Sequence, residues 1–162
     1  MRIPIVNEND EIIGYQERDD RNKTNISRVS ALWLTDEAGN VLLAQRAFNK
    51  GHHPGKWGPA VAGTVEEGET YEQNIIKEAE EEIGLAGVKF TMSVKIRRSS
   101  IHEYFCQWFT AVVPHDYPFV KREGEVENIK WFSKDELIQF VKEKPELCLE
   151  GLKQNIEFYL NL

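Results

Sequence analysis

The sequence predicts an α+β fold in which helices cover the faces of a mixed β-sheet. Three observations favour this fold. Segments of strand-like pattern alternate with segments of helical pattern, no segment is repeated, and 162 residues suit one domain, which we expect to span residues 1–162.

The first 28 residues predict a small β-hairpin followed by a charged connection. Ile3 to Val6 and Glu11 to Tyr15 flank the polar turn Asn7-Glu8-Asn9-Asp10. We expect residues 1–28 to extend the sheet, and the free edge of this extension is a candidate interface for a homodimer.

A second hairpin is expected to be the stronger one. Its strands, Val29 to Thr35 and Asn40 to Arg46, are rich in Val and Leu. Gly and Pro residues then mark Asn49 to Pro59 as a loop, and Ala60 to Ala62 is expected to be a short strand.

The clearest helix is Thr70 to Ile83, which lacks Gly and Pro and precedes Gly84, a predicted C-terminal cap. The remaining elements alternate strand and helix patterns. The predicted strands are Lys89 to Arg98, Glu103 to Val113 and Val126 to Phe132; the predicted helices run from Ser133 toward Lys142 and from Leu149 to Leu160.

Charge is concentrated in one segment. The net charge is −7, and Gly63 to Leu85 holds eight acids and one base, which leaves 19 acids and 19 bases elsewhere. This local acidity argues against binding to a nucleic acid polymer or an anionic membrane, and it predicts a cationic partner near residues 63–85.

No apolar run reaches the length of a membrane span, so we expect a cytoplasmic protein. The two cysteines, Cys106 and Cys148, are too few for a disulfide framework, and a buried thiol is the ordinary interpretation of Cys106.

Three carboxylates share one side of the predicted helix. At about 100° per residue, Glu78, Glu81 and Glu82 occupy an arc of about 100°. Like charges four residues apart repel, and a bound divalent cation would reverse that effect. Mg²⁺ takes oxygen ligands, commonly carboxylates together with substrate phosphate oxygens.

The apolar side of the same helix lies next to the carboxylates. Ile75, Ile76, Ala79 and Ile83 are expected to pack it on the sheet. The alternative is an ordinary solvated acidic face. Gly63 and Gly68, for which we expect unusual backbone just before the helix, favour the metal site.

These residues resemble the Nudix box, whose pattern is Gly, x5, Glu, x7, Arg, Glu, apolar, x, Glu, Glu, x, Gly, apolar. The match starts at Gly63, includes Glu69, and continues from Lys77 through Leu85. Its single departure is Lys77, which stands where the pattern has Arg. Lys keeps the charge but not the planar fork that binds a carboxylate through two hydrogen bonds.

The resemblance implies an α/β/α sandwich with a mixed β-sheet and the box at residues 63–85. It implies a hydrolase that cleaves a diphosphate linkage in a nucleoside diphosphate-type small molecule, with Mg²⁺ as cofactor and Mn²⁺ as an alternative. It also assigns site residues. Glu78, Glu81 and Glu82 are the implied metal ligands, Glu81 and Glu82 are implied catalytic residues, Glu69 and Lys77 support the loop and helix, Gly63 is the turn that closes the loop, and Gly84 ends the helix.

Members of this family often use a further Glu from outside the box. Glu125, which precedes the strand Val126 to Phe132, is our first candidate, and Glu103 is a weaker one. Arg46, His53 and Trp57 are candidate substrate contacts, with ordinary packing or solvent exposure as the alternative for each.

Part of the sequence is similar to type I isopentenyl diphosphate isomerase. The similarity lies in Pro54-Gly55-Lys56-Trp57, Ala60-Val61-Ala62-Gly63 and the first hairpin. That isomerase has a catalytic Cys immediately before the glycine that Gly63 matches, whereas this chain has Ala62. A hydrolase is therefore the preferred interpretation; an isomerase and a nucleotide-binding module without turnover are the alternatives.

Overall fold

Strand β3 organises a nine-stranded mixed sheet in the computed structural model, which describes residues 1–160. It pairs in parallel with β8 and antiparallel with β1, β4 and β6. Strand β7 extends the sheet beyond β8, β2 extends it beyond β1, and β4 also pairs with β5 and β9. The strands are β1 (Arg2–Val6), β2 (Ile12–Glu17), β3 (Ile26–Asp36), β4 (Val41–Arg46), β5 (Trp57–Pro59), β6 (Val61–Thr64), β7 (Thr91–Ser99), β8 (Glu103–Val113) and β9 (Val126–Phe132).

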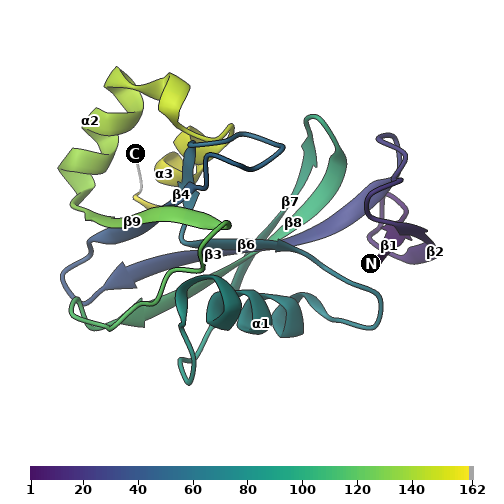
Figure 1. Ribbon diagram of the computed structural model, residues 1–162, viewed down its shortest axis with the longest axis horizontal. Helices are drawn as coiled ribbons and strands as arrows, with labels where there is room; N and C mark the ends of the chain where they lie inside the picture. The colour runs from purple at the N-terminus through teal and green to yellow at the C-terminus, as the bar shows by residue number, and fades with distance from the viewer. Residues whose placement is uncertain (161–162) are drawn as a thin grey trace.

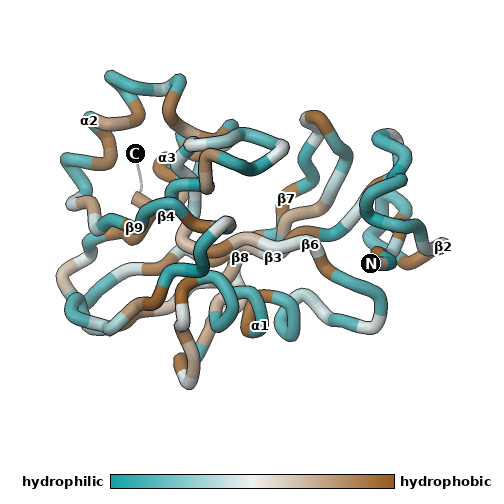
Figure 2. Tube along the Cα trace, viewed as in Figure 1, coloured by the Kyte–Doolittle hydropathy of each residue, from teal (hydrophilic) through white to brown (hydrophobic). Residues whose placement is uncertain are grey.

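Helices cover both faces of this sheet, as predicted. Helix α1 (Tyr71–Ile83) lies on one face, and α2 (Lys134–Glu143) and α3 (Leu152–Tyr159) lie on the other (Figure 1). The period of two along β3 explains the three layers: Leu32 and Leu34 pack in the core with α1, whereas Ala31 and Trp33 pack in the core with α2 and α3. Hydrophobic residues accordingly concentrate along the central strands (Figure 2).

The sequence predicts helix α1 almost to the residue. Thr70 caps its start in a reciprocal pair of hydrogen bonds with Gln73, and Gly84 ends it in the left-handed conformation, with φ 67°. Ile75, Ala79 and Ile83 are fully buried as expected, but Ile76 is 49% exposed, so the apolar face is narrower than predicted.

The second predicted hairpin is the weaker of the two. Strands β3 and β4 share only two paired positions, next to their turn, whereas β1 and β2 share five. The reason is that β3 and β4 separate to take different partners. The single short strand expected at Ala60 to Ala62 is in fact two, because β5 pairs with β4 and β6 crosses to pair with β3.

The last helix starts later than predicted. Residues Pro145–Leu147 form a 3₁₀ turn, and α3 begins only at Leu152, because Gly151 precedes it with φ 92°. Leu160 is the C-cap.

Asp10 joins the N-terminal hairpin to the rest of the fold. Its carboxylate accepts hydrogen bonds from Arg28 Nε and Lys95 Nζ, both at 2.7 Å, and from the Tyr71 hydroxyl at 2.9 Å. These partners belong to β3, β7 and α1. Through residue 160, no helix is both long and apolar enough to cross a bilayer.

Candidate active site

Gly63 brings strand β6 against the carboxylates of α1. A β-carbon built at position 63 would lie 2.4 Å from Cγ of Glu78 and 3.1 Å from Oδ1 of Asn74. Gly63 is a paired strand residue opposite Ser30, without a positive φ. The expectation of a turn at Gly63 was therefore wrong; the position requires glycine because Glu78 occupies the space of a side chain. Gly68, with φ 87°, does have the expected unusual backbone.

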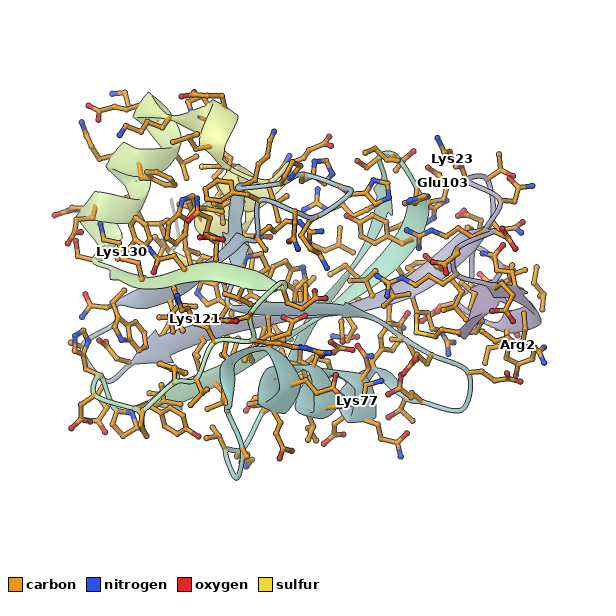
Figure 3. All side chains as sticks on the ribbon, in the orientation of Figure 1. Arg2, Lys23, Lys77, Glu103, Lys121 and Lys130 are labelled. Atoms are coloured by element: carbon orange, nitrogen blue, oxygen red, sulfur yellow. The ribbon has the colours of Figure 1, made fainter. Side chains whose placement is uncertain are left out.

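Lys77 connects the loop before α1 to the helix (Figure 3). Its ammonium contacts Glu66, lies 2.8 Å from Glu69 Oε2 and is 3.9 Å from Glu78 Oε1. Burial alone would lower the pKa of Lys77, but hydrogen bonds to Glu66 and Glu69 outweigh it and raise the pKa. The single ammonium of Lys77 thus lies within 4 Å of three carboxylates, those of Glu66, Glu69 and Glu78.

The second carboxylate oxygen of Glu69 holds the loop before α1 in place. Oε1 accepts hydrogen bonds from the Glu66 backbone N–H at 2.8 Å and from Asn74 Nδ2 at 3.3 Å. Asn74 is fully buried, also donates to the Thr64 carbonyl, and accepts from the Ser30 hydroxyl. The loop, strand β6 and helix α1 are thereby tied together around Gly63.

The segment before β9 docks on the end of α1 and positions Glu125. The backbone N–H of Val120 donates to the Ile83 carbonyl at 3.0 Å, and that of Arg122 donates to the Glu82 carbonyl at 2.9 Å. The Glu125 carboxylate pairs with Lys50 of the β4–β5 loop. The negative charge of Glu125 raises the pKa of Glu82, although the two residues are far apart in the sequence.

The carboxylates repel one another. Burial raises the pKa of Glu82, and the charges of Glu78 and Glu125 raise it further, to about 8, although a backbone hydrogen bond from Ala62 and the charge of Lys50 lower it. Burial also raises the pKa of Glu78, with Lys77 opposing it.

Glu81 is less enclosed than these two. Its side chain is 46% exposed and lies 3.8 Å from Arg122. Its charge still reaches Glu78 and raises the pKa of that residue. Within residues 1–160, no three His, Cys, Asp or Glu side chains already form a group that could hold a metal ion. The donor set nevertheless fits a hard divalent cation, because mutually repelling carboxylates are stabilised by one.

A cavity of about 270 Å³ opens on the other side of β6. It is bounded by the β4–β5 loop, the β7–β8 turn, the start of α3 and the connection before β3. Ala62, Arg46 and His53 line it. Arg46 donates to the His52 carbonyl at 2.9 Å and also lies near the charges of Glu82 and Glu125, so it connects the cavity with the carboxylates.

Two other candidates lie apart from this arrangement. Trp57 does not line the cavity; its ring packs edge-on against Phe132 and Phe140, which makes packing its observed role. Glu103, the first residue of β8, accepts hydrogen bonds from the Ser99 hydroxyl and from Arg97 at 3.0 Å. Cys106 is buried as expected, and burial raises its thiol pKa to about 12.

Several residues of the cavity are not predicted by the sequence. They are Arg18 and Arg21 from the connection before β3, Arg98 near the end of β7, and His102 from the β7–β8 turn. No local motif marks them, because they meet only when β3 and β8 align in parallel from Ile26 and Glu103 onward.

Comparisons with known proteins agree with this geometry. Residues 24–149 match the NUDIX domain family. An uncharacterised Nudix hydrolase of Yersinia pestis is 29% identical over 139 residues, covering 83% of this chain and 74% of that protein. An isopentenyl-diphosphate delta-isomerase of Enterobacter is 27% identical over 152 residues, covering 88% of this chain and 82% of its own.

Solved structures share the fold. The crystal structure of DR0079 from Deinococcus radiodurans superposes with a TM-score of 0.83, at 21% identity and 98% coverage of both chains. A Caenorhabditis elegans Ap4A hydrolase superposes with a TM-score of 0.60, at 19% identity, over 85% of this chain and 100% of that one.

Proposed function

The chain belongs to the Nudix hydrolase family, whose members act on pyrophosphate bonds, and from this premise we propose that it is a Mg²⁺-dependent hydrolase of a nucleoside diphosphate-type small molecule. The observation that carries the proposal is the environment of Glu82 on α1: burial, the charge of Glu78 from the same helix and the charge of Glu125 from the segment before β9 together raise its pKa to about 8. Glu103, engaged by Arg97 and Ser99, is not included in this site.

Glu78, Glu82 and Glu125 would hold the cation, with Glu81 as a further ligand or base at the exposed side. The cation would neutralise non-bridging phosphate oxygens and make the attacking water more acidic. Mn²⁺ suits the same oxygen donors.

The chain's own residues position the reaction. Lys77 and Glu69 hold the loop against α1, and Lys50 holds Glu125. Arg46 feels the charges of Glu82 and Glu125 from the cavity side without pairing with either, and it is the proposed contact to substrate phosphate, with His53 also lining the cavity.

The reaction replaces one P–O bond by another. Oxygen of a water molecule attacks one phosphorus, a carboxylate of Glu125, Glu82 or Glu81 accepts its proton, and the bond from that phosphorus to the bridging oxygen breaks. The products are two phosphate compounds, and no oxidant or further reactant is consumed.

Isomerisation of a prenyl diphosphate is the second candidate, favoured by the relative that is 27% identical. It needs an acid or base that can exchange a proton with carbon, and Ala62 offers none. Cys106 also lines the cavity, but a thiol with a pKa of about 12 is a poor substitute.

Phosphate release tests the proposal. The protein is incubated with nucleoside diphosphate compounds in Mg²⁺, in Mn²⁺ and in EDTA, with coupling phosphatases, while isopentenyl diphosphate is followed for isomerised product. Metal-dependent release on any compound supports the hydrolase. Isomerised product supports the second candidate, and Mg²⁺-dependent binding without turnover supports a nucleotide-binding module.

We also propose a cytoplasmic location and a homodimer formed through the hairpin. Cys106 and Cys148 are free and buried, as in reducing compartments. Strand β2 ends the sheet and exposes Ile12, Ile13 and Tyr15. Sedimentation of the protein beside Ile13→Lys tests the dimer, which the substitution should dissociate.

A further inference from the structure

The cavity beside β6 gathers the unpaired arginines of the chain. The sequence has eight arginines. Four of them form ion pairs with carboxylates: Arg2, Arg28, Arg97 and Arg122. The other four have no such partner among residues 1–160, and all four line the cavity: Arg18, Arg21, Arg46 and Arg98. The protein has 27 acids and a net charge of −7, so the gathering of four arginines without a carboxylate partner in one cavity is a specific feature of the fold.

Three of the four histidines also line this cavity: His52, His53 and His102. Neither ring nitrogen of His102 has a hydrogen-bond partner in the described chain, although both are buried. Burial lowers the pKa of His102, and the charges of Arg21, His52 and Lys23 lower it further. Lys23 lies near this end of the sheet, where β8 begins at Glu103 (Figure 3).

Part of the cavity lining is apolar. Val29, Ala31 and Trp108 line it from β3 and β8. Trp108 is 5% exposed, and its indole Nε1–H is buried without a partner within residues 1–160. Glu150 is the one carboxylate among the lining residues, and it already accepts a hydrogen bond from Ser100 at 3.0 Å. The cavity therefore combines four arginines and an unpaired indole donor with a single carboxylate.

The part of the cavity around Arg21 and His102 is separate from the carboxylate site. Glu82 and Glu125 act on Arg46, but the charges that act on Arg21 and His102 are all cationic. Arg46 is thus the link between two centres of opposite sign. A ligand that satisfies both must carry one anionic group near Arg46 and a second one near Arg21, Arg98 and His102.

We propose that this cavity binds a second phosphate group of the substrate, distinct from the diphosphate that is cleaved. Guanidinium groups match phosphate oxygens through paired hydrogen bonds, which favours a phosphate over an uncharged sugar. A cavity of about 270 Å³ takes a part of a substrate and leaves the diphosphate outside, next to Glu82. The inference rests on the proposed hydrolase and names its substrate class: diphosphates with an additional phosphomonoester.

Binding of inorganic phosphate in EDTA tests the cavity without catalysis. Calorimetry would compare the intact protein with Arg21→Gln, Arg98→Gln and the control Arg2→Gln, whose arginine pairs with Glu67 outside the cavity. We expect each cavity variant to weaken binding by about tenfold or more, and the control by less than about twofold. Absent phosphate binding, or equal affinities in all four proteins, would overturn the inference; thermal unfolding confirms that each variant is folded.

Hydrolysis of matched substrates tests the substrate class. Coenzyme A is compared with dephospho-coenzyme A, and the dinucleotide NADP⁺ with NAD⁺, because each pair differs by one phosphomonoester. We expect KM to be at least about tenfold lower for the phosphorylated member, Arg21→Gln to remove that difference, and the control Arg2→Gln to keep it. Turnover of both members with equal KM contradicts the inference and keeps the hydrolase. Phosphate binding without any turnover contradicts the hydrolase and keeps the anion site.

Discussion

Glu78 fills the space that a side chain at Gly63 would need: a β-carbon there would lie 2.4 Å from Cγ and 2.7 Å from Cδ of Glu78. A larger residue at this position therefore has to displace the Glu78 side chain. The contact explains a glycine whose backbone is that of an ordinary strand residue.

Gly63→Ala should displace Glu78 without unfolding the protein. We expect hydrolysis to fall by at least about tenfold, since small displacements at a reacting centre are costly, and stability to fall by about 1 to 3 kcal/mol from overpacking. The readouts are kcat/KM and urea unfolding. Gly14→Ala, where the nearest atom to the new carbon is 4.0 Å away, should change neither. Full activity in Gly63→Ala would show that the position of Glu78 is not critical.

Lys77→Met should leave Glu66 and Glu69 without their cation. Both carboxylates are partly buried, so we expect a loss of about 1 to 3 kcal/mol in the free energy of unfolding, together with lower activity. Lys77→Arg keeps the charge and should retain activity within about threefold, because the fork can reach the same carboxylates. Urea unfolding of both variants checks this; equal stability of Lys77→Met and the original protein would contradict it.

Asp10→Asn should loosen the N-terminal hairpin. Burial by itself raises the pKa of Asp10, but hydrogen bonds from Lys95, Arg28 and Tyr71 outweigh it and lower the pKa below 3.8. Because the folded pKa is depressed, this stabilisation is present above about pH 4 and is lost as the pH falls below it. Asparagine also tolerates the φ of 60° at this position.

Urea unfolding across a range of pH measures this effect. At pH 7 we expect Asp10→Asn to be less stable than the original protein by about 1 to 3 kcal/mol, and the difference should shrink below pH 4. Asp20→Asn, an exposed acid of the connection, is the control and should be neutral. A difference that stays constant from pH 7 to pH 3 would exclude the charge of Asp10 as its cause.

Glu82→Gln should stabilise the metal-free protein. Glu78 and Glu125 repel the Glu82 carboxylate, so removing its charge relieves that repulsion and raises Tm in EDTA at pH 9, above the Glu82 pKa of about 8. Adding Mg²⁺ should raise Tm of the original protein and have less effect on the variant. A lower Tm for Glu82→Gln in EDTA would contradict this account of the carboxylates.

The sequence predicts the local elements well because their signals are local. The start of α1 is defined by the cap of Thr70 and Gln73, and its end by the left-handed Gly84. The Val- and Leu-rich run at Val29 to Thr35 is typical of a strand covered on both faces, as β3 is. The division of residues 57–64 between β5 and β6 was not predictable, since it depends on β3 and β4 separating to take other partners.

The site residues also divide into those with a local sequence signal and those brought together only by the fold. Glu78 and Glu82 share a helix, so their spacing anticipates their proximity, and Glu125 was reached through the family resemblance. Arg21 and His102 are 81 residues apart in the sequence and meet through the parallel pairing of β3 with β8. Neither residue carries a local signal, because only the three-dimensional fold shows that both line one cavity and that the ring nitrogens of His102 are buried without a partner within residues 1–160.

The most direct test of the proposed hydrolase compares kcat/KM of Glu82→Gln with that of Glu80→Gln on the best substrate of the Mg²⁺ panel. Both residues are glutamates of α1, but Glu80 is exposed, whereas burial and the charges of Glu78 and Glu125 raise the pKa of Glu82. We predict a loss of at least about a hundredfold for Glu82→Gln and a change within about threefold for Glu80→Gln. Equal activity of the two variants would contradict the assignment of the active site to these carboxylates.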